Sequence, residues 1–495
     1  MAQESATPFG IDGDWEFLSV DGERRAASGD ERIDVENPAT RETVTTVPAA
    51  TPADVDAAYE AAVAAQDEWA ARPPQARAEV VQAAMGLLDE HGDALADALV
   101  RESGSTHAKA HVELEELATG MMAEAASFPT RAQGTHADSV IPGRENEIHR
   151  DPVGVVGIIS PWNVPFHLSM RAVAPAIALG NAVVLKPAEE TPVTGGLAIA
   201  RLFEEAGLPP GVLNVVPGYG EDAGDAVASN PDADVVSFTG STEVGRLVAQ
   251  SAASNLALPA LELGGNNPQV VLEDADLDLA VDAAVFGSFF HQGQICISIN
   301  RHLVHESLYD EYVERLAERA EGLTVGDPAE DPEVDLGPVI DESQRDEMLE
   351  YVAASVDEGA RLVTGGDHDG LFVEPTVLAD ATSDMAVACN EHFGPIAPVI
   401  PFGDDDEAVE LANDTHYGLT ASVLSTDLGR AKRIADRVEA GMVHVNDQPI
   451  NDEPHIPFGG VKGSGMGRYN GEAIMREFTE QRWVSLQHER REYPF

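Results

Sequence analysis

The chain has 495 residues, of which 87 are acidic and 30 basic, and its formal net charge is −57. A surface this acidic repels phosphate backbones, which argues against nucleic-acid binding. The hydrophobic fraction of 43% is enough to fill folded cores, so wholesale disorder is excluded. Since a single core stops growing at roughly 250–300 residues, the length predicts more than one folding unit.

The two cysteines, Cys296 and Cys389, are too few for a disulfide scaffold or a four-ligand zinc site, and we expect no metal centre. Residues 1–5 lack the basic patch and apolar run of a signal peptide, and no stretch approaches the roughly 20 apolar residues of a membrane span. We therefore expect a cytoplasmic protein that does not associate with membranes.

The acidic excess is spread along the chain, and the only lysines are Lys109, Lys186, Lys432 and Lys462. This pattern favours adaptation to a salt-rich cytoplasm, where a Debye length of about 3 Å at 1 M salt screens the self-repulsion. An unusually acidic mesophilic protein is the alternative. Because lysine is so scarce, each remaining lysine is a stronger functional candidate than usual.

The N-terminal part of the chain is predicted to be helical. Thr51 caps a helix that begins at Pro52, and further helical patterns cover about 75–100 and 107–126. The segment 131–150 and the tail 478–487 look extended and belong to no strand–helix alternation. Both are therefore expected to pair with another subunit.

From residue 153 strands and helices alternate. Apolar, β-branched runs that precede helical segments lie at 155–159, 182–185, 212–216 and 234–238, and Pro192 and Gly207 bound one of the helices. A second such region follows Glu262, with strands expected at 269–272, 302–305, 421–424 and 442–445. Apolar strands that alternate with helices predict parallel sheets covered on both faces, so we expect two α/β lobes.

Three side chains are candidates for catalysis. Cys296 follows Gly293 on an irregular segment beyond a predicted helix, although a buried cysteine is usually inert. Glu262, between two leucines, is either a solvent-facing strand end or a base whose pKa is raised in an apolar pocket. Asn163 follows a predicted strand, where its amide either stabilises a turn or donates to an oxyanion.

Further motifs point to a nucleotide. Lys186 and Glu189 lie at a strand end, where a carboxylate can bind a ribose. Gly240–Gly245 is a strand–turn–helix junction whose free N–H groups suit an anion. The run Gly218–Gly224 looks like a dinucleotide fingerprint, but its last spacing is one residue too long.

Together these motifs resemble those of the aldehyde dehydrogenase superfamily, and the likeness runs from about residue 30 to the end of the chain. The matching motifs, in order, are Asn163, Lys186, Gly240–Gly245, Glu262, Gly293-Gln294-Ile295-Cys296, Glu391-His392-Phe393-Gly394-Pro395 and Pro457-Phe458-Gly459-Gly460. The resemblance implies an α/β fold with two parallel-sheet, Rossmann-like domains and a β oligomerisation arm. It divides the chain into an NAD-binding domain (1–130 and 152–261), a catalytic domain (262–465), and an arm and tail (131–151 and 466–495) that assemble homodimers or homotetramers.

The resemblance also implies a role for each site residue. Cys296 would be the nucleophile, Glu262 the base for the deacylating water, and Asn163 an oxyanion donor beside the Cys296 N–H. The expected NAD-binding residues are Ile159, Trp162, Lys186, Glu189, Gly240, Ser241, Gly245, Leu263, Gly264, Glu391 and Phe393. The implied reaction is NAD-dependent oxidation of an aldehyde to a carboxylic acid through a thiohemiacetal and a thioester at Cys296.

The segment His291-Gln292-Gly293-Gln294-Ile295-Cys296 is similar to the branch that acts on aromatic aldehydes such as benzaldehyde and vanillin. Apolar side chains expected to line the substrate pocket are Phe166, Phe290, Ile295, Ile297 and Phe458. If Arg171 faces this pocket, a semialdehyde with an acidic group is the better substrate; a short aliphatic aldehyde is a further alternative. A nucleotide-independent thiol esterase and a non-enzymatic binding protein are alternatives from other classes.

Overall fold

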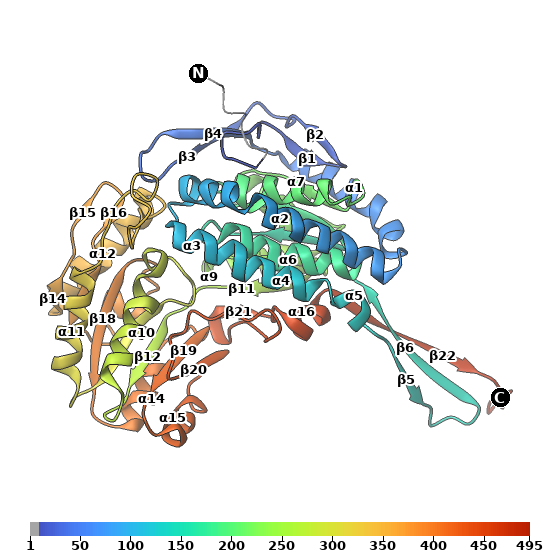
Figure 1. Ribbon diagram of the computed structural model, residues 1–495. Helices are drawn as coiled ribbons and strands as arrows, with labels where there is room; N and C mark the ends of the chain where they lie inside the picture. The colour runs from blue at the N-terminus through green and yellow to red at the C-terminus, as the bar shows by residue number, and fades with distance from the viewer. Residues whose placement is uncertain (1–8) are drawn as a thin grey trace.

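The computed structural model describes residues 9–495, which form two large sheets flanked by helices and a long projecting arm (Figure 1). The absence of a signal peptide was expected from residues 1–5, which lie outside the described residues. Between residues 9 and 495, every helix is too short or too polar to cross a lipid bilayer.

The first sheet has eight strands. Their order is β2 (Glu23–Arg25), β1 (Leu18–Val20), β9 (Leu213–Val215), β8 (Ala182–Lys186), β7 (Val155–Ile159), β10 (Val235–Thr239), β11 (Leu258–Glu262) and β21 (Gly465–Met466). The five strands from β9 to β11 are parallel, whereas β1, β2 and β21 add antiparallel edges. The main helices of this part are α1 (Pro52–Ala70), α2 (Pro74–Ser103), α6 (Pro165–Leu179), α7 (Ala198–Glu205), α8 (Asp225–Ser229) and α9 (Thr242–Ser254).

The second sheet has seven strands. Their order is β14 (Arg361–Thr364), β17 (Thr376–Ala379), β18 (Ile396–Phe402), β13 (Ile299–His305), β12 (Asn267–Val271), β19 (Thr420–Leu424) and β20 (Met442–Val445). All are parallel except β14. The main helices here are α10 (Leu277–Phe289), α11 (Tyr309–Glu321), α12 (Glu342–Glu358), α14 (Asp405–Asn413) and α15 (Leu428–Ala435).

Strand composition explains why both sheets are covered on two faces. Val156 and Ile158 of β7 pack into one hydrophobic core, whereas Val155 and Ile159 pack into another on the opposite face. Because successive side chains of a strand point to opposite faces, a continuous apolar run needs a helical layer on each side. The two predicted α/β lobes are confirmed.

The helical region 107–126 is less regular than predicted. It consists of α3 (His107–His111), a π-helical segment η1 (Val112–Ala118) and α4 (Thr119–Ala125), which follow one another without a break. The helix bounded by Pro192 and Gly207 likewise begins with a π-helical turn, η2 (Val193–Leu197). The wider π turns change which side chains share a face, and they cannot be read from a 3.6-residue period.

The two extended segments pair with each other along nine residues. β22 (Thr479–Gln487) runs antiparallel to β6 (Arg144–Pro152), which also pairs with β5 (Thr135–Asp138). Figure 1 shows these three strands extending away from the rest of the molecule, with the C-terminus near the far end of the arm. The short helix α16 (Gly471–Glu477) precedes β22 and leads from the first sheet into the arm.

Candidate active site

The predicted catalytic side chains come from both lobes and meet between them. Asn163 lies in the loop after β7, and Glu262 is the last residue of β11, so both lie at carboxyl ends of parallel strands. Cys296 lies between α10 and β13 of the second lobe. All three line one cavity.

The segment before Cys296 has an unusual backbone. His291, Gln292 and Gly293 follow one another with φ angles of 51°, 56° and 72°. A side chain at Gly293 would place its Cβ 2.2 Å from the carbonyl oxygen of Gly394, so only glycine fits there. Left-handed conformations at two non-glycine residues are costly and persist only when the surroundings impose them.

Hydrogen bonds from distant residues impose this conformation. The Gln292 amide donates to the carbonyl oxygens of Gly104 and Pro338 at 3.1 and 2.7 Å. Asn267 donates to the carbonyl oxygens of Cys296 and Ser298 at 2.9 and 2.7 Å. Residues 291–298, here called the nucleophile segment, are therefore held in place both before and after Cys296.

The thiol of Cys296 is held largely in its neutral form. Burial raises its pKa to about 12; the Arg171 guanidinium lowers it, whereas the carboxylates of Glu391 and Glu262 raise it further. Since the thiolate is the nucleophile, the thiol needs a base or a substrate-induced change to lose its proton.

Glu262 is a buried carboxylate without hydrogen bonds. Its side chain is 2% exposed, neither carboxylate oxygen has a hydrogen-bond partner, and burial raises its pKa to about 8. A side chain at Gly459 would place its Cβ 2.5 Å from Glu262 Oε1, so the Pro457–Gly460 turn leaves room for this carboxylate. The solvent-facing strand end, one of the two interpretations that the sequence allowed, is wrong because the side chain is buried, and the role as a base stays a prediction.

Asn163 is buried and fixed at two points. Its side-chain Nδ2 donates to the carbonyl oxygen of Gln294 at 2.8 Å, and its own carbonyl oxygen accepts from Lys109 Nζ at 2.8 Å. Because an amide nitrogen carries two hydrogens, the bond to Gln294 leaves one donor available beside Cys296.

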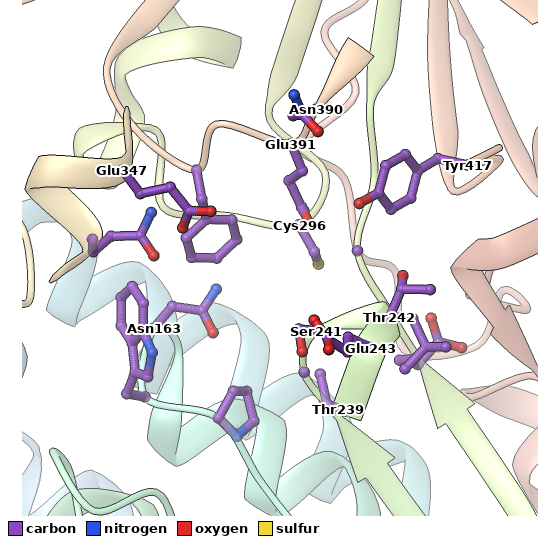
Figure 2. A pocket seen from close by; sticks show the side chains of 18 of the residues that line it. Asn163, Thr239, Ser241, Thr242, Glu243, Cys296, Glu347, Asn390, Glu391 and Tyr417 are labelled. Atoms are coloured by element: carbon purple, nitrogen blue, oxygen red, sulfur yellow. The ribbon is translucent and has the colours of Figure 1, made fainter. Parts of the chain in front are cut away.

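The cavity on one side of Cys296 has a volume of about 420 Å³. Figure 2 shows Asn163, Cys296 and Glu391 around the cavity, with Ser241 and Glu243 from the first lobe. Predicted coenzyme residues that line it are Trp162, Gly240, Ser241, Leu263, Gly264, Glu391 and Phe393. Lining residues that sequence reasoning missed include Thr239, Gln344, Glu347, Tyr351 and Tyr417.

Glu391 is fixed at the wall of this cavity. Its Oε1 accepts from the Gly265 N–H at 2.9 Å, and a Cβ at Gly264 would lie 2.1 Å from its Oε2. Burial raises its pKa to about 8, although the bond from Gly265 acts in the opposite direction. Phe393, at φ 49°, meets the Trp162 ring edge to face with centroids 5.5 Å apart.

The remaining predicted coenzyme residues lie outside this cavity's lining. Lys186 Nζ pairs with Glu189 Oε1 at 3.0 Å, and that oxygen also accepts from the Gly220 N–H at 2.6 Å. The glycine run that failed as a fingerprint therefore touches the predicted ribose carboxylate. Ile159 pairs with Lys186 in the sheet, and a Cβ at Gly245 would lie 2.3 Å from the Leu263 side chain.

A second cavity, of about 310 Å³, lies on the other side of Cys296. Four of the five predicted pocket side chains line it, namely Phe290, Ile295, Ile297 and Phe458, and Phe286 was missed. The expectation for Phe166 is wrong: its ring is fully buried in the core of the first lobe. Phe166 is the second residue of α6, so its side chain follows the helix face that packs inward.

Arg171 lines this second cavity and has one carboxylate partner, whereas its Nε and Nη2 atoms have no hydrogen-bond partner. Its Nη1 pairs with Asp452 at 3.4 Å, and its guanidinium lies 4.5 and 4.9 Å from the ring centroids of Phe458 and Tyr469. Asp452 also bonds to His167 at 3.0 Å.

Among residues 9–495 no group of three or more His, Cys, Asp or Glu side chains is arranged to hold a metal ion.

Comparison with known proteins decides the family. The model of the aldehyde dehydrogenase family matches residues 25–484. The chain belongs to the aldehyde dehydrogenase family. This confirms the resemblance seen in the motifs.

Curated relatives of this aldehyde dehydrogenase cover nearly the whole chain. A benzaldehyde dehydrogenase of Bacillus subtilis is 45% identical over 96% of this chain and 98% of its own length. A vanillin dehydrogenase of Corynebacterium glutamicum is 48% identical over 88% of this chain and 90% of its own. The solved structure of a betaine aldehyde dehydrogenase from Staphylococcus aureus in complex with NAD+ is 34% identical, covers 96% and 95% of the two chains, and superimposes with a TM-score of 0.93. The fold expected from the resemblance is confirmed.

Proposed function

We propose that this enzyme oxidises aromatic or bulky apolar aldehydes to carboxylic acids with NAD. The observation that carries the proposal is the position of Cys296, which lines two cavities of different character. The first has a mixed lining that includes Ser241, Thr242 and Glu391, whereas apolar atoms make up most of the lining of the second. A thiol at their boundary can contact an aldehyde from one side and a coenzyme from the other.

The residues around the first cavity suit a dinucleotide. Ser241 caps α9 at the carboxyl end of β10, where free N–H groups favour a phosphate. Glu391, in the wall of this cavity, suits one ribose, and the partly exposed carboxylate of Glu189, which lies outside the lining, suits the hydroxyls of the other. When bound there, NAD supplies the acceptor for the hydride that leaves the aldehyde carbon.

The chain supplies the other steps. The Cys296 thiol first gives its proton to solvent water, and the thiolate then attacks the carbonyl carbon. The Asn163 amide and the Cys296 N–H stabilise the resulting oxyanion. Loss of the hydride leaves a thioester on Cys296. Glu262 then removes a proton from water, which hydrolyses the thioester and releases the acid.

Charge in the second cavity favours neutral substrates. Its charged lining residues are Lys109, Arg171, Glu113, Glu116, Asp452 and Glu453. Carboxylates outnumber cations, and Arg171 is already paired with Asp452, so an acidic semialdehyde meets net repulsion. The named activities of the benzaldehyde and vanillin dehydrogenases support the aromatic class.

NADH absorbance with a panel of aldehydes tests the proposal. Benzaldehyde should exceed both a short aliphatic aldehyde and succinic semialdehyde in kcat/KM, with NAD in molar salt. A tenfold preference for the semialdehyde, about 1.4 kcal/mol in the transition state, would contradict the aromatic class but not the dehydrogenase. Absence of NADH with every aldehyde would instead favour the thiol esterase.

The nucleophile has a direct test. Cys296→Ala should abolish NADH formation but leave NAD binding, measured by calorimetry, within about threefold of wild type, because the sulfur alone is removed. Cys389→Ala is the matched control, since this exposed thiol lies outside both cavities. Steady-state turnover in Cys296→Ala would refute the assignment.

We further propose that the enzyme works as a homodimer or homotetramer in a salt-rich cytoplasm. The arm exposes Trp483 (65%) and Leu486 (38%), apolar side chains that a partner subunit would cover. We also propose that residues 1–130 and 152–261 form the NAD-binding domain, residues 262–465 the catalytic domain, and residues 131–151 and 466–495 the arm and tail. Sedimentation of the intact chain and of a chain ending at residue 478 tests it, since the shorter chain should lose its oligomeric mass.

A further inference from the structure

A buried ion pair lies beside the catalytic residues. Lys109 of α3 and Glu113 of η1 are four residues apart, and Lys109 Nζ lies 2.6 Å from Glu113 Oε2. Their side chains are 2% and 1% exposed. Lys109 is also one of only four lysines in the chain, and both side chains line the second cavity together with Cys296.

Each end of the pair contacts the segment that carries Asn163. Lys109 Nζ donates to the Asn163 carbonyl oxygen at 2.8 Å. Glu113 Oε1 accepts from the backbone N–H groups of Phe166 and His167 at 2.8 and 3.1 Å. These are among the first N–H groups of α6, which have no partner within the helix and favour a negative charge.

Each charge of the ion pair contacts backbone groups of opposite polarity, on either side of the turn between Asn163 and α6. The cation faces a carbonyl oxygen, and the anion faces the start of a helix. Asn163 itself lies in a loop without regular structure, and its side chain reaches Gln294 of the nucleophile segment. The side chain of Asn163 is thus fixed by Gln294, and its backbone is fixed from the other side by Lys109.

We propose that Lys109 and Glu113 are positioning residues that hold the Asn163 amide beside the Cys296 sulfur. This inference rests on the proposed function, in which Asn163 donates to the oxyanion. Stability alone does not explain the pair, because a buried ion pair is often no more stabilising than apolar side chains of similar volume.

The first test is Lys109→Met. The kcat should fall about 10- to 100-fold, since a donor displaced from the oxyanion loses much of its effect. The KM values for NAD and benzaldehyde should stay within about threefold of wild type. A folded variant with kcat within twofold of wild type would overturn the proposal.

The double variant Lys109→Met/Glu113→Gln separates positioning from folding. It contains no unpaired buried charge, so its melting temperature should recover relative to Lys109→Met. Its kcat should stay low, because the Asn163 carbonyl still lacks its donor. Recovery of kcat together with the melting temperature would show a merely structural role and overturn the proposal.

An Asn163→Ala background shows whether the pair acts through Asn163. Adding Lys109→Met to Asn163→Ala should lower kcat by less than about twofold, because the amide to be positioned is already gone. Multiplicative effects of the two changes would contradict the inference.

Glu102 provides the matched control. It is another fully buried carboxylate that accepts from backbone N–H groups at a helix start, those of Val193 and Thr194 at 2.8 Å each. Glu102→Gln should lower the melting temperature without lowering kcat, and a loss of kcat equal to that of Lys109→Met would count against the proposal. NADH formation by the wild type tests the proposed function, whereas the ratio of variant to wild-type kcat tests the pair.

Discussion

Neither carboxylate oxygen of Glu262 has a hydrogen-bond partner, and burial raises the pKa of this side chain to about 8. Arg171 and Arg468 act in the opposite direction but do not outweigh the burial. A carboxyl whose pKa lies close to the working pH can both accept and release a proton, which a fully ionised surface carboxylate does poorly. This environment suits the base of the deacylation step.

Two consequences for Glu262 can be measured. Because a base acts in its deprotonated form, the steady-state rate should rise with pH through about 8.

Glu262→Gln should still give one burst of NADH per site and then stall at the thioester, since only hydrolysis loses its base. Stopped-flow absorbance separates the two phases, and sustained turnover in this variant would contradict the role.

Glu189 should set the choice of coenzyme. The Glu189 carboxylate forms an ion pair with Lys186 at 3.0 Å. Its negative charge would repel the 2′-phosphate of NADP. The ratio of kcat/KM for NAD over NADP should fall at least tenfold in Glu189→Ser. Glu189→Gln keeps the shape but not the charge, so a similar fall there would assign the effect to electrostatics. Equal efficiencies in the wild type would show that Glu189 does not discriminate.

Sequence reasoning selected Cys296, Glu262 and Asn163, which line one cavity, because each lies in a short, contiguous motif. It also identified Lys109 as a candidate from the scarcity of lysine, but not its partner, since Glu113 is one of many acidic residues. Gln344 and Glu347 were missed because α12 reaches the cavity only through tertiary packing. Phe166 was wrongly assigned to the substrate pocket, because its closeness to Asn163 in the sequence does not determine which face of α6 its side chain occupies.

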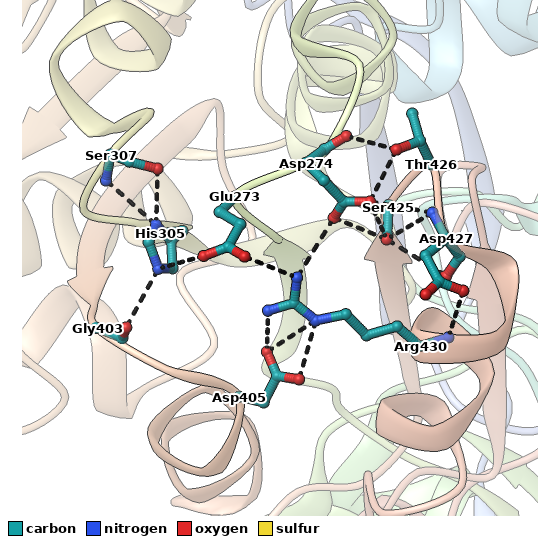
Figure 3. A network of polar contacts seen from close by, with 10 residues as sticks. All are labelled: Glu273, Asp274, His305, Ser307, Gly403, Asp405, Ser425, Thr426, Asp427 and Arg430. Carbon is teal, nitrogen blue, oxygen red and sulfur yellow. Dashed lines mark hydrogen bonds and ion pairs between the residues drawn. The ribbon is translucent and has the colours of Figure 1, made fainter.

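At the scale of elements, Arg430 of α15 joins the segment after β12 to the start of α14. Figure 3 shows its guanidinium between Glu273, Asp274 and Asp405. The Nε atom bonds both oxygens of Asp405 at 3.1 and 2.9 Å, which lowers the pKa of that carboxyl. The carboxylate of Asp274 in turn accepts from Ser425, Thr426 and the Asp427 N–H.

Loss of Arg430 should therefore destabilise the second lobe. Arg430→Met leaves three carboxylates close together, and the free energy of unfolding should fall by about 1.5–3 kcal/mol, as for hydrogen bonds to charged groups. Arg361→Met, which removes one exposed contact to Asp380 at 3.1 Å, should cost less than about 1 kcal/mol. Urea unfolding of both variants provides the comparison, and equal losses would contradict a special role for this network.

Strands β7, β8, β9 and β10 of the first lobe were predictable to within one residue at each end, because apolar β-branched runs leave few alternatives, whereas β11 was missed. The edge strands β1, β2 and β21 were not predictable, since each has only two or three residues and gains its structure from the neighbouring strand. The π-helical turns η1 and η2 were also missed. There tertiary contacts, such as those of Glu113 and Glu102, determine the local geometry.

At the scale of the whole molecule, the −57 formal charge sets the conditions for stability. Like charges repel across the surface, and most basic side chains are already used in ion pairs such as Lys432 with Asp436 and Lys462 with Glu439. The 30 basic side chains are too few to neutralise the 87 acidic ones. Counter-ions must therefore do so.

Salt should raise the melting temperature. As KCl increases from dilute to molar concentrations, the Debye length falls from about 30 Å at 0.01 M to about 3 Å at 1 M, which removes repulsion between distant carboxylates. Calorimetry across this range, with sucrose as an uncharged control, measures the effect. A melting temperature that does not change with KCl would rule out the adaptation to salt.

Because Cys296 lines two cavities, the proposed coenzyme and aldehyde would approach it from different sides. A compound wedged between Phe290 and Phe458 would occupy the aldehyde route and leave the groups around Ser241 and Glu391 free. Inhibitors can therefore be directed at one route without competing for the other. A compound that fills only the apolar cavity would need no chemical likeness to NAD.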